Sequence, residues 1–146
     1  MQGNISFWLG AWGALLATLL AALRFYEAWR ARQRLQATHD FTSDPNIGNE
    51  VIVINISGTP VMVNYWVLEW SKRRWWRKRQ VVSTIEPEHG GGSFTISPHS
   101  RYALGFADAD YFDWGYKTRP GQKLWIKLHI AGRRKPVLLK VFDPEK

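Results

Sequence analysis

The pattern of apolar and polar positions divides the chain into an apolar N-terminal segment and a longer region of short, alternating runs. Residues 5–23 form an uninterrupted stretch of nineteen positions without a charge. As a helix this stretch would cover roughly 28 Å, close to the thickness of the hydrocarbon layer of a bilayer. The sequence therefore predicts one N-terminal transmembrane helix, which together with its basic juxtamembrane extension occupies residues 1–37.

The flanks of this segment predict its orientation. No Lys or Arg precedes it, whereas Arg24, Arg30, Arg32 and Arg34 follow it. Because basic flanks are retained on the cytoplasmic side, we expect the N-terminus outside and the C-terminal domain in the cytoplasm. The side chains expected at the membrane interface are Arg24, Tyr26, Trp29 and Arg30.

Small side chains gather on one side of the projected helix and large ones on the other. The helix-packing positions on the small side are Gly10, Gly13, Ala14, Ala17 and Ala21. Small faces let helix backbones approach closely, so this face predicts association with a second copy or with another membrane protein subunit. The alternative is that Ala is simply frequent in such helices.

The region after the helix reads as a turn-rich linker, 38–49, followed by a β domain, 50–146. Short β-branched and aromatic runs alternate there with turn residues, as in all-β sandwiches and barrels. We expect strands at 51–57, 61–71, 80–86, 93–97, 102–106, 123–130 and 137–142. About seven strands in this length predict an all-β fold, an immunoglobulin-like β-sandwich.

The strand at 123–130 shows the alternation most clearly. Leu124, Ile126 and Leu128 share one face with Ile130, and Trp125, Lys127 and His129 share the other. After it, residues 131–134 predict a hairpin turn. Pro136 cannot donate a ladder hydrogen bond and should lie at a strand start or an edge.

Composition narrows the classes of function. The chain has no Cys, which excludes disulfides, thiolate catalysis and cysteine-ligated zinc. A formal net charge of +8 and nine Trp favour partners with anionic surfaces, such as lipid headgroups or nucleic acid.

A basic segment with two indoles is the most distinctive feature outside the helix. Its residues are Lys72, Arg73, Arg74, Trp75, Trp76, Arg77, Lys78 and Arg79. It could meet anionic lipid headgroups, an acidic protein partner or single-stranded nucleic acid, or it could be a solvated hairpin tip. We favour the membrane surface, rank a protein partner next, and place nucleic acid last.

Other candidate chemistry is sparse. Asp108, Asp110 and Asp113 could hold Ca²⁺, but the glycine and distal glutamate of a calcium-binding loop are missing, which favours a solvated acidic loop. That loop could pair with the basic segment of a neighbouring copy. His39, His89, His99 and His129 lack metal-ligand spacing, and no catalytic motif is present. The sequence therefore predicts neither an enzyme, a metal site nor a cofactor.

Three local turns stand out in the β region. They are residues 55–61, with sequence Asn-Ile-Ser-Gly-Thr-Pro-Val, residues 96–100, and the hairpin at Gly132 and Arg133. These turns resemble those of a loose group of small bacterial single-span proteins with a C-terminal immunoglobulin-like domain of unknown function. The resemblance implies a location at the bacterial inner membrane and carries no established activity.

The favoured function is a non-enzymatic, membrane-anchored interaction protein. It would be an accessory subunit of a membrane complex or a homo-oligomer, whose sandwich contacts a protein partner, anionic lipid, or both. The alternative is a signalling or defence effector, in which a ligand on the sandwich drives clustering of the helices.

Overall fold

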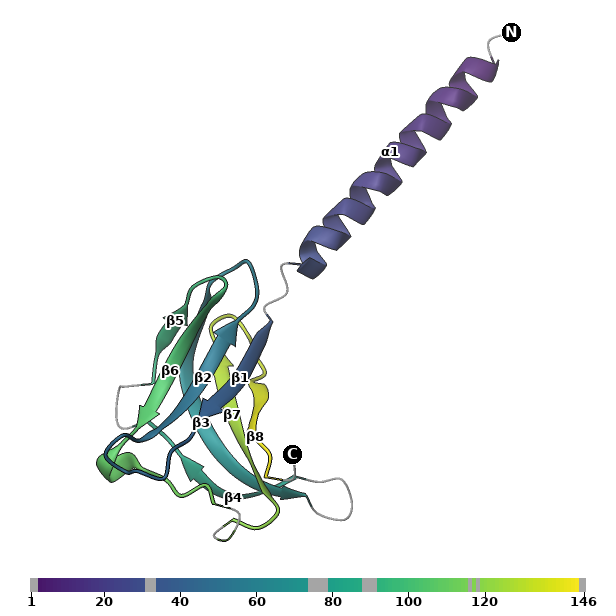
Figure 1. Ribbon diagram of the computed structural model, residues 1–146. Helices are drawn as coiled ribbons and strands as arrows, with labels where there is room; N and C mark the ends of the chain where they lie inside the picture. Colours follow the sequence, from purple (N-terminus) through teal and green to yellow (C-terminus); the bar gives the residue numbers. More distant parts are fainter. Residues whose placement is uncertain are drawn as a thin grey trace. The chain divides into compact units, whose positions relative to one another are not determined.

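A computed structural model describes residues 3–30, 34–73, 79–87, 92–115, 117 and 119–144, without the side chains of 3–7, 9, 28–30 and 73. The chain divides into two compact units, Met1–Arg32 and Gln33–Lys146, which are described separately. The first contains one helix and the second is built from β-strands (Figure 1).

Helix α1 (Gly3–Arg30) contains the apolar segment and extends beyond it. Leu and Ala are strong helix formers, and no Pro interrupts the segment. Thr18 donates its hydroxyl hydrogen bond to the carbonyl oxygen of Ala14 at 2.8 Å, so its polar group is satisfied within the helix. The prediction of an N-terminal helix is therefore confirmed.

The prediction that this helix crosses a membrane is wrong. Among the residues that the structure describes, no helix is both long enough and apolar enough to span a bilayer. The charges of Arg24 and Glu27 follow the apolar segment within the same helix. The absence of charge over nineteen residues was thus an insufficient criterion.

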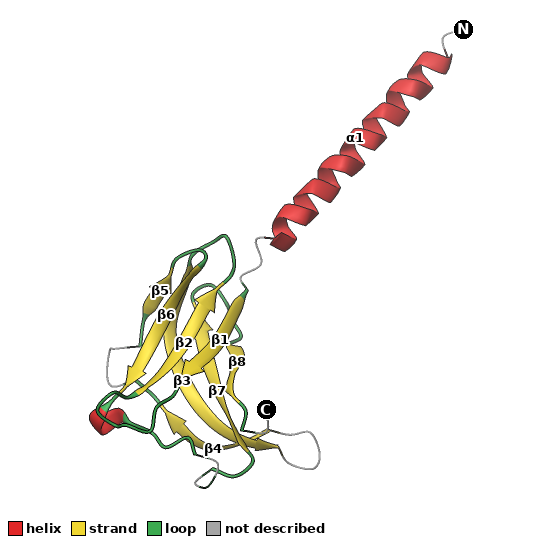
Figure 2. Cartoon of the chain, in the orientation of Figure 1, coloured by secondary structure: helices red, strands yellow, loops and turns green. Residues whose placement is uncertain are grey.

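The second unit is β-rich (Figure 2). Its strands are β1 (Leu35–Asp40), β2 (Asn49–Asn55), β3 (Val61–Arg73), β4 (Arg79–Ile85), β5 (Phe94–Ile96), β6 (Ser100–Phe106), β7 (Gln122–Ile130) and β8 (Val137–Phe142), with the 3₁₀ helix η1 (Asp108–Asp110) between β6 and β7. One sheet has the order β1-β2-β6. The other has the order β4-β3-β7-β8, and β5 pairs with the first residues of β3.

The two sheets share one hydrophobic core. Val51 and Val53 of β2 are fully buried, and so are Leu68 and Trp70 of β3. Because side chains alternate across a strand, each sheet turns one face inward and the other outward. The predicted alternation in β7 is confirmed: Leu124, Ile126, Leu128 and Ile130 are buried, whereas Trp125 and Lys127 are half-buried and His129 is exposed.

Strand β1 was not predicted. It pairs with β2 along its whole length, from Leu35 opposite Asn55 to Asp40 opposite Glu50. The compact β unit accordingly begins before residue 38, where the sequence predicted a linker, and residues 38–40 of that linker lie in β1. Residues 41–48 do form a turn-rich connection.

Two connections require glycine. Gly48 has φ +82°, and a Cβ there would come within 2.6 Å of the carbonyl oxygen of Phe106. Gly132 has φ +77° in the turn between β7 and β8, where the amide of Arg133 donates to the carbonyl oxygen of Ile130 at 3.1 Å. The predicted hairpin turn is confirmed, and Pro136 directly precedes β8 as expected.

Candidate interaction surface

The basic segment begins at the ends of two paired strands. Lys72 of β3 lies opposite Gln80 of β4, and Arg73 lies opposite Arg79. The segment therefore joins two strands, as predicted. The remaining predicted surface residues, Arg74, Trp75, Trp76, Arg77 and Lys78, lie outside the described residues, so the structure places only the base of this hairpin.

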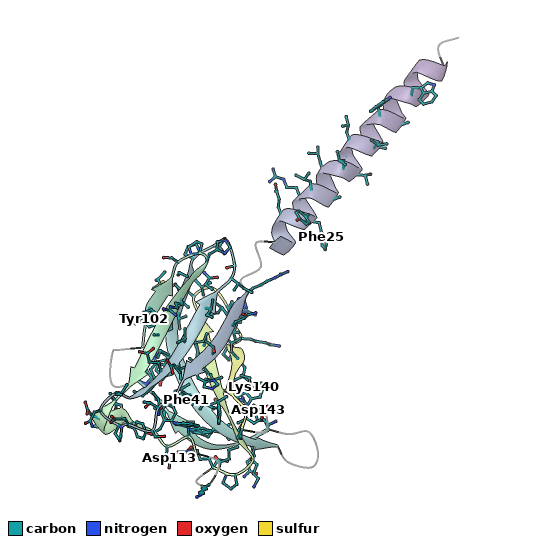
Figure 3. All side chains as sticks on the ribbon, viewed as in Figure 1. Phe25, Phe41, Tyr102, Asp113, Lys140 and Asp143 are labelled. Atoms are coloured by element: carbon teal, nitrogen blue, oxygen red, sulfur yellow. The ribbon has the colours of Figure 1, made fainter. Side chains whose placement is uncertain are left out.

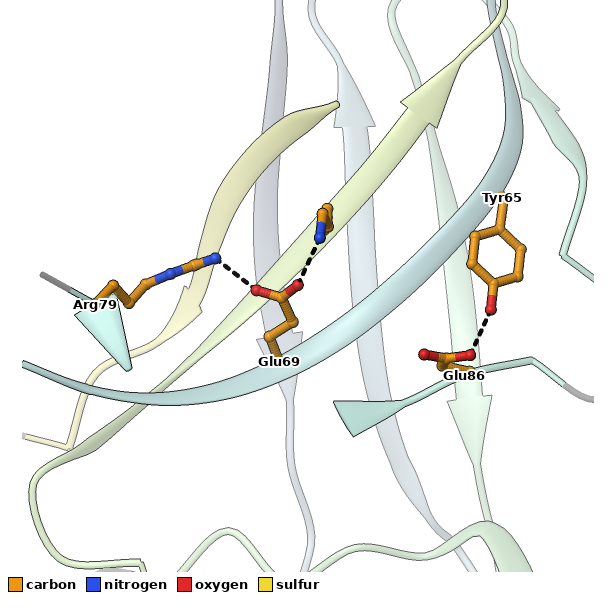
Figure 4. Close-up of polar contacts among 5 residues, drawn as sticks. Tyr65, Glu69, Arg79 and Glu86 are labelled. Carbon is orange, nitrogen blue, oxygen red and sulfur yellow. Dashed lines mark hydrogen bonds and ion pairs between the residues drawn. The ribbon is translucent and has the colours of Figure 1, made fainter. Parts of the chain in front are cut away.

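A carboxylate anchors the base of the hairpin on the outer face of the larger sheet. Glu69 of β3 accepts a hydrogen bond from Nη2 of Arg79 at 2.5 Å and another from Nζ of Lys127 at 3.0 Å (Figure 4). These contacts join three neighbouring strands, β4, β3 and β7. The Glu69 side chain is 4% exposed, so its charge is held almost out of water between two cations.

The strand pleat explains the position of Glu69. Its neighbours Leu68 and Trp70 point into the core, so Glu69 points outward, between Thr84 of β4 and Trp125 of β7. The guanidinium of Arg79 lies 5.4 Å from the ring centroid of Trp125, within the range of a cation–π contact. Arg79 is therefore held by both a carboxylate and an indole.

A second carboxylate repeats the arrangement on the same face. Asp143 accepts from Nζ of Lys123 at 3.0 Å and from Nζ of Lys140 at 3.1 Å (Figure 3). In both networks the carboxylates are buried and the cations are partly exposed. The exposed fractions are 4% for Glu69, 8% for Asp143, 29% for Arg79, 35% for Lys127, 28% for Lys123 and 38% for Lys140.

This layering gives the outer face of the larger sheet a cationic exterior. The negative charges are covered, whereas the ammonium and guanidinium groups reach water. Exposed, separated cations attract anionic groups over a distance comparable with the Debye length, about 8 Å at physiological ionic strength. The surface formed by Arg79, Lys123, Lys127 and Lys140 is therefore suited to an anionic partner.

A hydrogen bond between Tyr65 and Glu86 lies farther along the same face. The hydroxyl of Tyr65 donates to Oε2 of Glu86 at 2.7 Å. This hydrogen bond raises the pKa of Tyr65 above its usual 10.0, and burial and the negative charge of Glu86 act in the same direction. Tyr65 is thus a stable hydrogen-bond donor and is poorly suited to act as a base.

Glu86→Gln is expected to lower the pKa of Tyr65, because Gln carries no charge to oppose the phenolate. The wild-type contact contributes to stability below the ordinary tyrosine pKa of 10.0, and this contribution is lost as the pH rises through the raised folded pKa. Ultraviolet titration of phenolate absorbance, with Tyr65→Phe subtracted, measures the shift. An unchanged titration would contradict the assignment of Glu86 as the cause.

The acidic loop lies in the connection between β6 and β7. Asp108 and Asp110 are exposed in η1, and Asp113 is exposed after it (Figure 3). Asp113 accepts from the amide of Gly115 at 2.9 Å through Oδ1, and from Nε of Arg119 through its carbonyl oxygen at 2.8 Å. The Asp113 carboxylate thus serves turn geometry, and the described part of the chain contains no group of three or more metal-ligating side chains.

Arg119 ties the connection after this loop to the core. Its guanidinium carbon lies 4.6 Å from the ring centroid of Trp70, and Nη1 donates to the hydroxyl of Ser83 at 3.1 Å. Burial lowers the pKa of Arg119, and the nearby charge of Asp113 opposes that shift. Arg119 therefore has a structural role.

Among the described residues, the histidines belong to no group of three or more side chains that could hold a metal ion. Nδ1 of His39 lies 2.8 Å from the carbonyl oxygen of Val141, His99 occupies a turn with φ +53°, and the ring of His129 lies 5.9 Å from that of Tyr65. His89 lies outside the described residues.

The helix-packing residues lie on an open surface of α1. A Cβ built on Gly10 or Gly13 would meet no atom within 4 Å, and Ala14, Ala17 and Ala21 are exposed. Of the predicted membrane-interface residues, Arg24 donates to Glu27 at 3.4 Å and both side chains are exposed, as is Tyr26. The side chains of Trp29 and Arg30 lie outside the description.

Comparison with known proteins does not assign the chain to a family. No family model matches the chain, and no curated protein is similar to it at a significant level. The argument for function therefore rests on the two units themselves.

Proposed function

We propose that this chain is a non-enzymatic interaction protein. Helix α1 associates with the same helix of a second copy, and the β-sandwich presents cationic surface to an anionic partner. One observation carries the proposal, namely the exposed apolar surface of α1.

The large apolar side chains of α1 are exposed by more than half. The fractions are 64% for Trp8, 62% for Trp12, 61% for Leu15, 52% for Leu16, 60% for Leu19, 62% for Leu20 and 53% for Leu23. Contiguous apolar surface of this kind marks an interaction site, because each buried side chain contributes about 1.5–3 kcal/mol. The helix is therefore suited to a partner that covers it.

A second copy of α1 would cover the small-residue side of this helix and leave most of the large side chains, which lie on the opposite side, to another contact. The distance between packed helix axes depends on the side chains at the contact, and Gly and Ala allow the closest approach. Gly10, Gly13, Ala14, Ala17 and Ala21 supply such a face, and space is open at both glycines. Two such faces would pack together, and Leu16 and Leu20 at their border would extend the contact.

Gly13→Leu is expected to weaken self-association of the full chain at least tenfold, because Leu would separate the two backbones. Light scattering or sedimentation in mild detergent measures the mass. Trp12→Leu is the matched control, since it introduces the same side chain on the opposite face. Equal masses for both variants, or a monomeric wild type, would contradict pairing through the small face. A stable assembly with unrelated subunits would instead make the chain an accessory subunit.

We also propose that the sandwich is immunoglobulin-like. Its sheets β1-β2-β6 and β4-β3-β7-β8 correspond in order to the A-B-E and C′-C-F-G strands of that fold. In this fold the sheet faces and end loops serve as binding surfaces, which supports an interaction role by analogy.

A further inference from the structure

One end of the sandwich carries cations from several separate segments. The chain enters β1 there, and the β2–β3, β5–β6 and β7–β8 connections lie at the same end (Figure 1). The amide of Ile56 donates to the carbonyl oxygen of Arg34, and the amide of Ala131 donates to the carbonyl oxygen of Met62. Nδ2 of Asn55, the last residue of β2, donates to the carbonyl oxygens of Ile96 and Ser97. These hydrogen bonds hold the β5–β6 connection against the β2–β3 connection.

Five exposed cations lie at this end, which we call the loop end. They are Arg34, Arg101, Arg133, Arg134 and Lys135. The described residues of the entry to β1 and of the three connections contain no Asp or Glu. In the described part of the chain, no ion pair joins a carboxylate to Arg101 or to Arg133, Arg134 and Lys135 of the β7–β8 turn. Ile56, 40% exposed, adds an apolar side chain.

The opposite end of the smaller sheet is acidic. Its exposed carboxylates are Asp40, Asp44, Glu50, Asp108, Asp110 and Asp113. Asp40 and Glu50 are paired positions at the far ends of β1 and β2, and the amide of Asp108 donates to the carbonyl oxygen of Pro45 at 3.0 Å. The smaller sheet is therefore polarised along its strands, cationic at the loop end and anionic at the other.

We propose that the loop end docks on an anionic lipid surface. A planar anionic layer attracts the five cations and repels the six carboxylates at the far end of the smaller sheet. The base of the basic hairpin lies at the far end of the larger sheet, so the charge of the smaller sheet is what favours docking through the loop end. Each basic side chain at such a surface raises affinity by about fivefold. Arg101, Arg133, Arg134 and Lys135, which no ion pair joins to a carboxylate in the described part of the chain, contribute this attraction in full, whereas Arg79, Lys123, Lys127 and Lys140 already share two carboxylates.

The length of β3 separates this end from the basic hairpin. β3 starts at the loop end with Val61 and reaches the hairpin at Arg73, a distance of roughly 40 Å at about 3.3 Å per residue. That distance exceeds the Debye length several times. A lipid surface that meets the loop end while the acidic end is held away from it does not reach the base of the hairpin. The hairpin base and the outer face of the larger sheet are then left for a different anionic partner.

The test compares two full-length variants with the same change in charge. The first replaces Arg101, Arg133, Arg134 and Lys135 with Ser, and the control replaces Lys72, Arg74, Arg77 and Lys78 with Ser. Binding is measured by cosedimentation with phosphatidylcholine vesicles, with and without phosphatidylserine, because any contribution of α1 is common to both. The loop-end variant should lose roughly 100- to 600-fold of the phosphatidylserine-dependent partitioning, and the hairpin variant should lose less than fivefold.

A single labelled cysteine reports the direction of docking. The chain has no Cys, so Ile56→Cys and Asp110→Cys each carry one environment-sensitive fluorophore. With phosphatidylserine vesicles the Ile56 probe should respond and the Asp110 probe should not. Equal loss in both charge variants, or equal response of both probes, would overturn the proposal. Lipid-free, salt-sensitive self-association lost in the loop-end variant would assign this end to the acidic end of a second copy instead.

Discussion

Asn55→Ala is expected to destabilise the sandwich by about 3 kcal/mol, the largest loss we expect from a single polar side chain. Asn55 is fully buried at the end of β2. Its Oδ1 accepts from the amide and the hydroxyl of Ser57, and its Nδ2 donates to the carbonyl oxygens of Thr59, Ile96 and Ser97. Removing the amide would leave buried donors and acceptors without partners.

The loss can be measured by urea unfolding followed through tryptophan fluorescence, and it should lower the melting temperature by about 10 °C. Asn64→Ala is the matched control, since Asn64 is exposed on β3 and the same atoms are removed there. Asn64→Ala should change the unfolding free energy by less than about 0.5 kcal/mol. Similar losses in both variants would show that Asn55 does not hold the loop end together.

The loop end thus depends on an interior residue that the sequence presented only as part of a turn. The turn at residues 55–61 was recognised by its Asn, Gly and Pro. The hydrogen bonds from Asn55 to Ile96 and Ser97 could not be predicted from the sequence, because those partners lie more than forty positions away along the chain. The prediction that the loop end binds lipid requires these hydrogen bonds, since they hold the β2–β3 and β5–β6 connections together.

Strand alternation explains which elements could be predicted. β7 has a regular exchange of aliphatic and polar residues, so both its faces were assigned correctly. β1 has the short sequence Leu-Gln-Ala-Thr-His-Asp, in which Leu35 and Ala37 give little apolar signal. Its position is set by pairing with β2, a tertiary contact that a local pattern does not contain.

The charged networks escaped prediction for a related reason. Apart from Glu69, β3 is apolar on both faces from Trp66 to Trp70. The sequence therefore did not show toward which face of the sheet the Glu69 side chain points. The partners of Glu69 are 10 and 58 positions away. The cations of the loop end likewise come from separate segments, whereas the contiguous basic segment at 72–79 was obvious in the sequence.

Glu69→Ala is expected to destabilise the sandwich by about 2 to 3 kcal/mol and to loosen β4. Breaking a buried pair by removing one partner costs about 3–5 kcal/mol, because the remaining charges are left without compensation. Here the two cations are 29% and 35% exposed, so water offsets part of that loss. Hydrogen exchange should rise at the amides of Arg79–Ile85, since Arg79 links β4 to Glu69.

Two further variants separate the charge imbalance from the loss of packing. Glu69→Met with Arg79→Met and Lys127→Met removes all three charges and keeps apolar volume, so it should recover at least half of the lost stability. Glu86→Ala, an exposed carboxylate on the same face, should cost less than about 1 kcal/mol. If the triple variant were less stable than Glu69→Ala, the ion network itself would be stabilising β4. Recovery would instead show that the network lowers the unfolding free energy slightly and holds cations in place on the surface. An anionic partner requires cations held in this way.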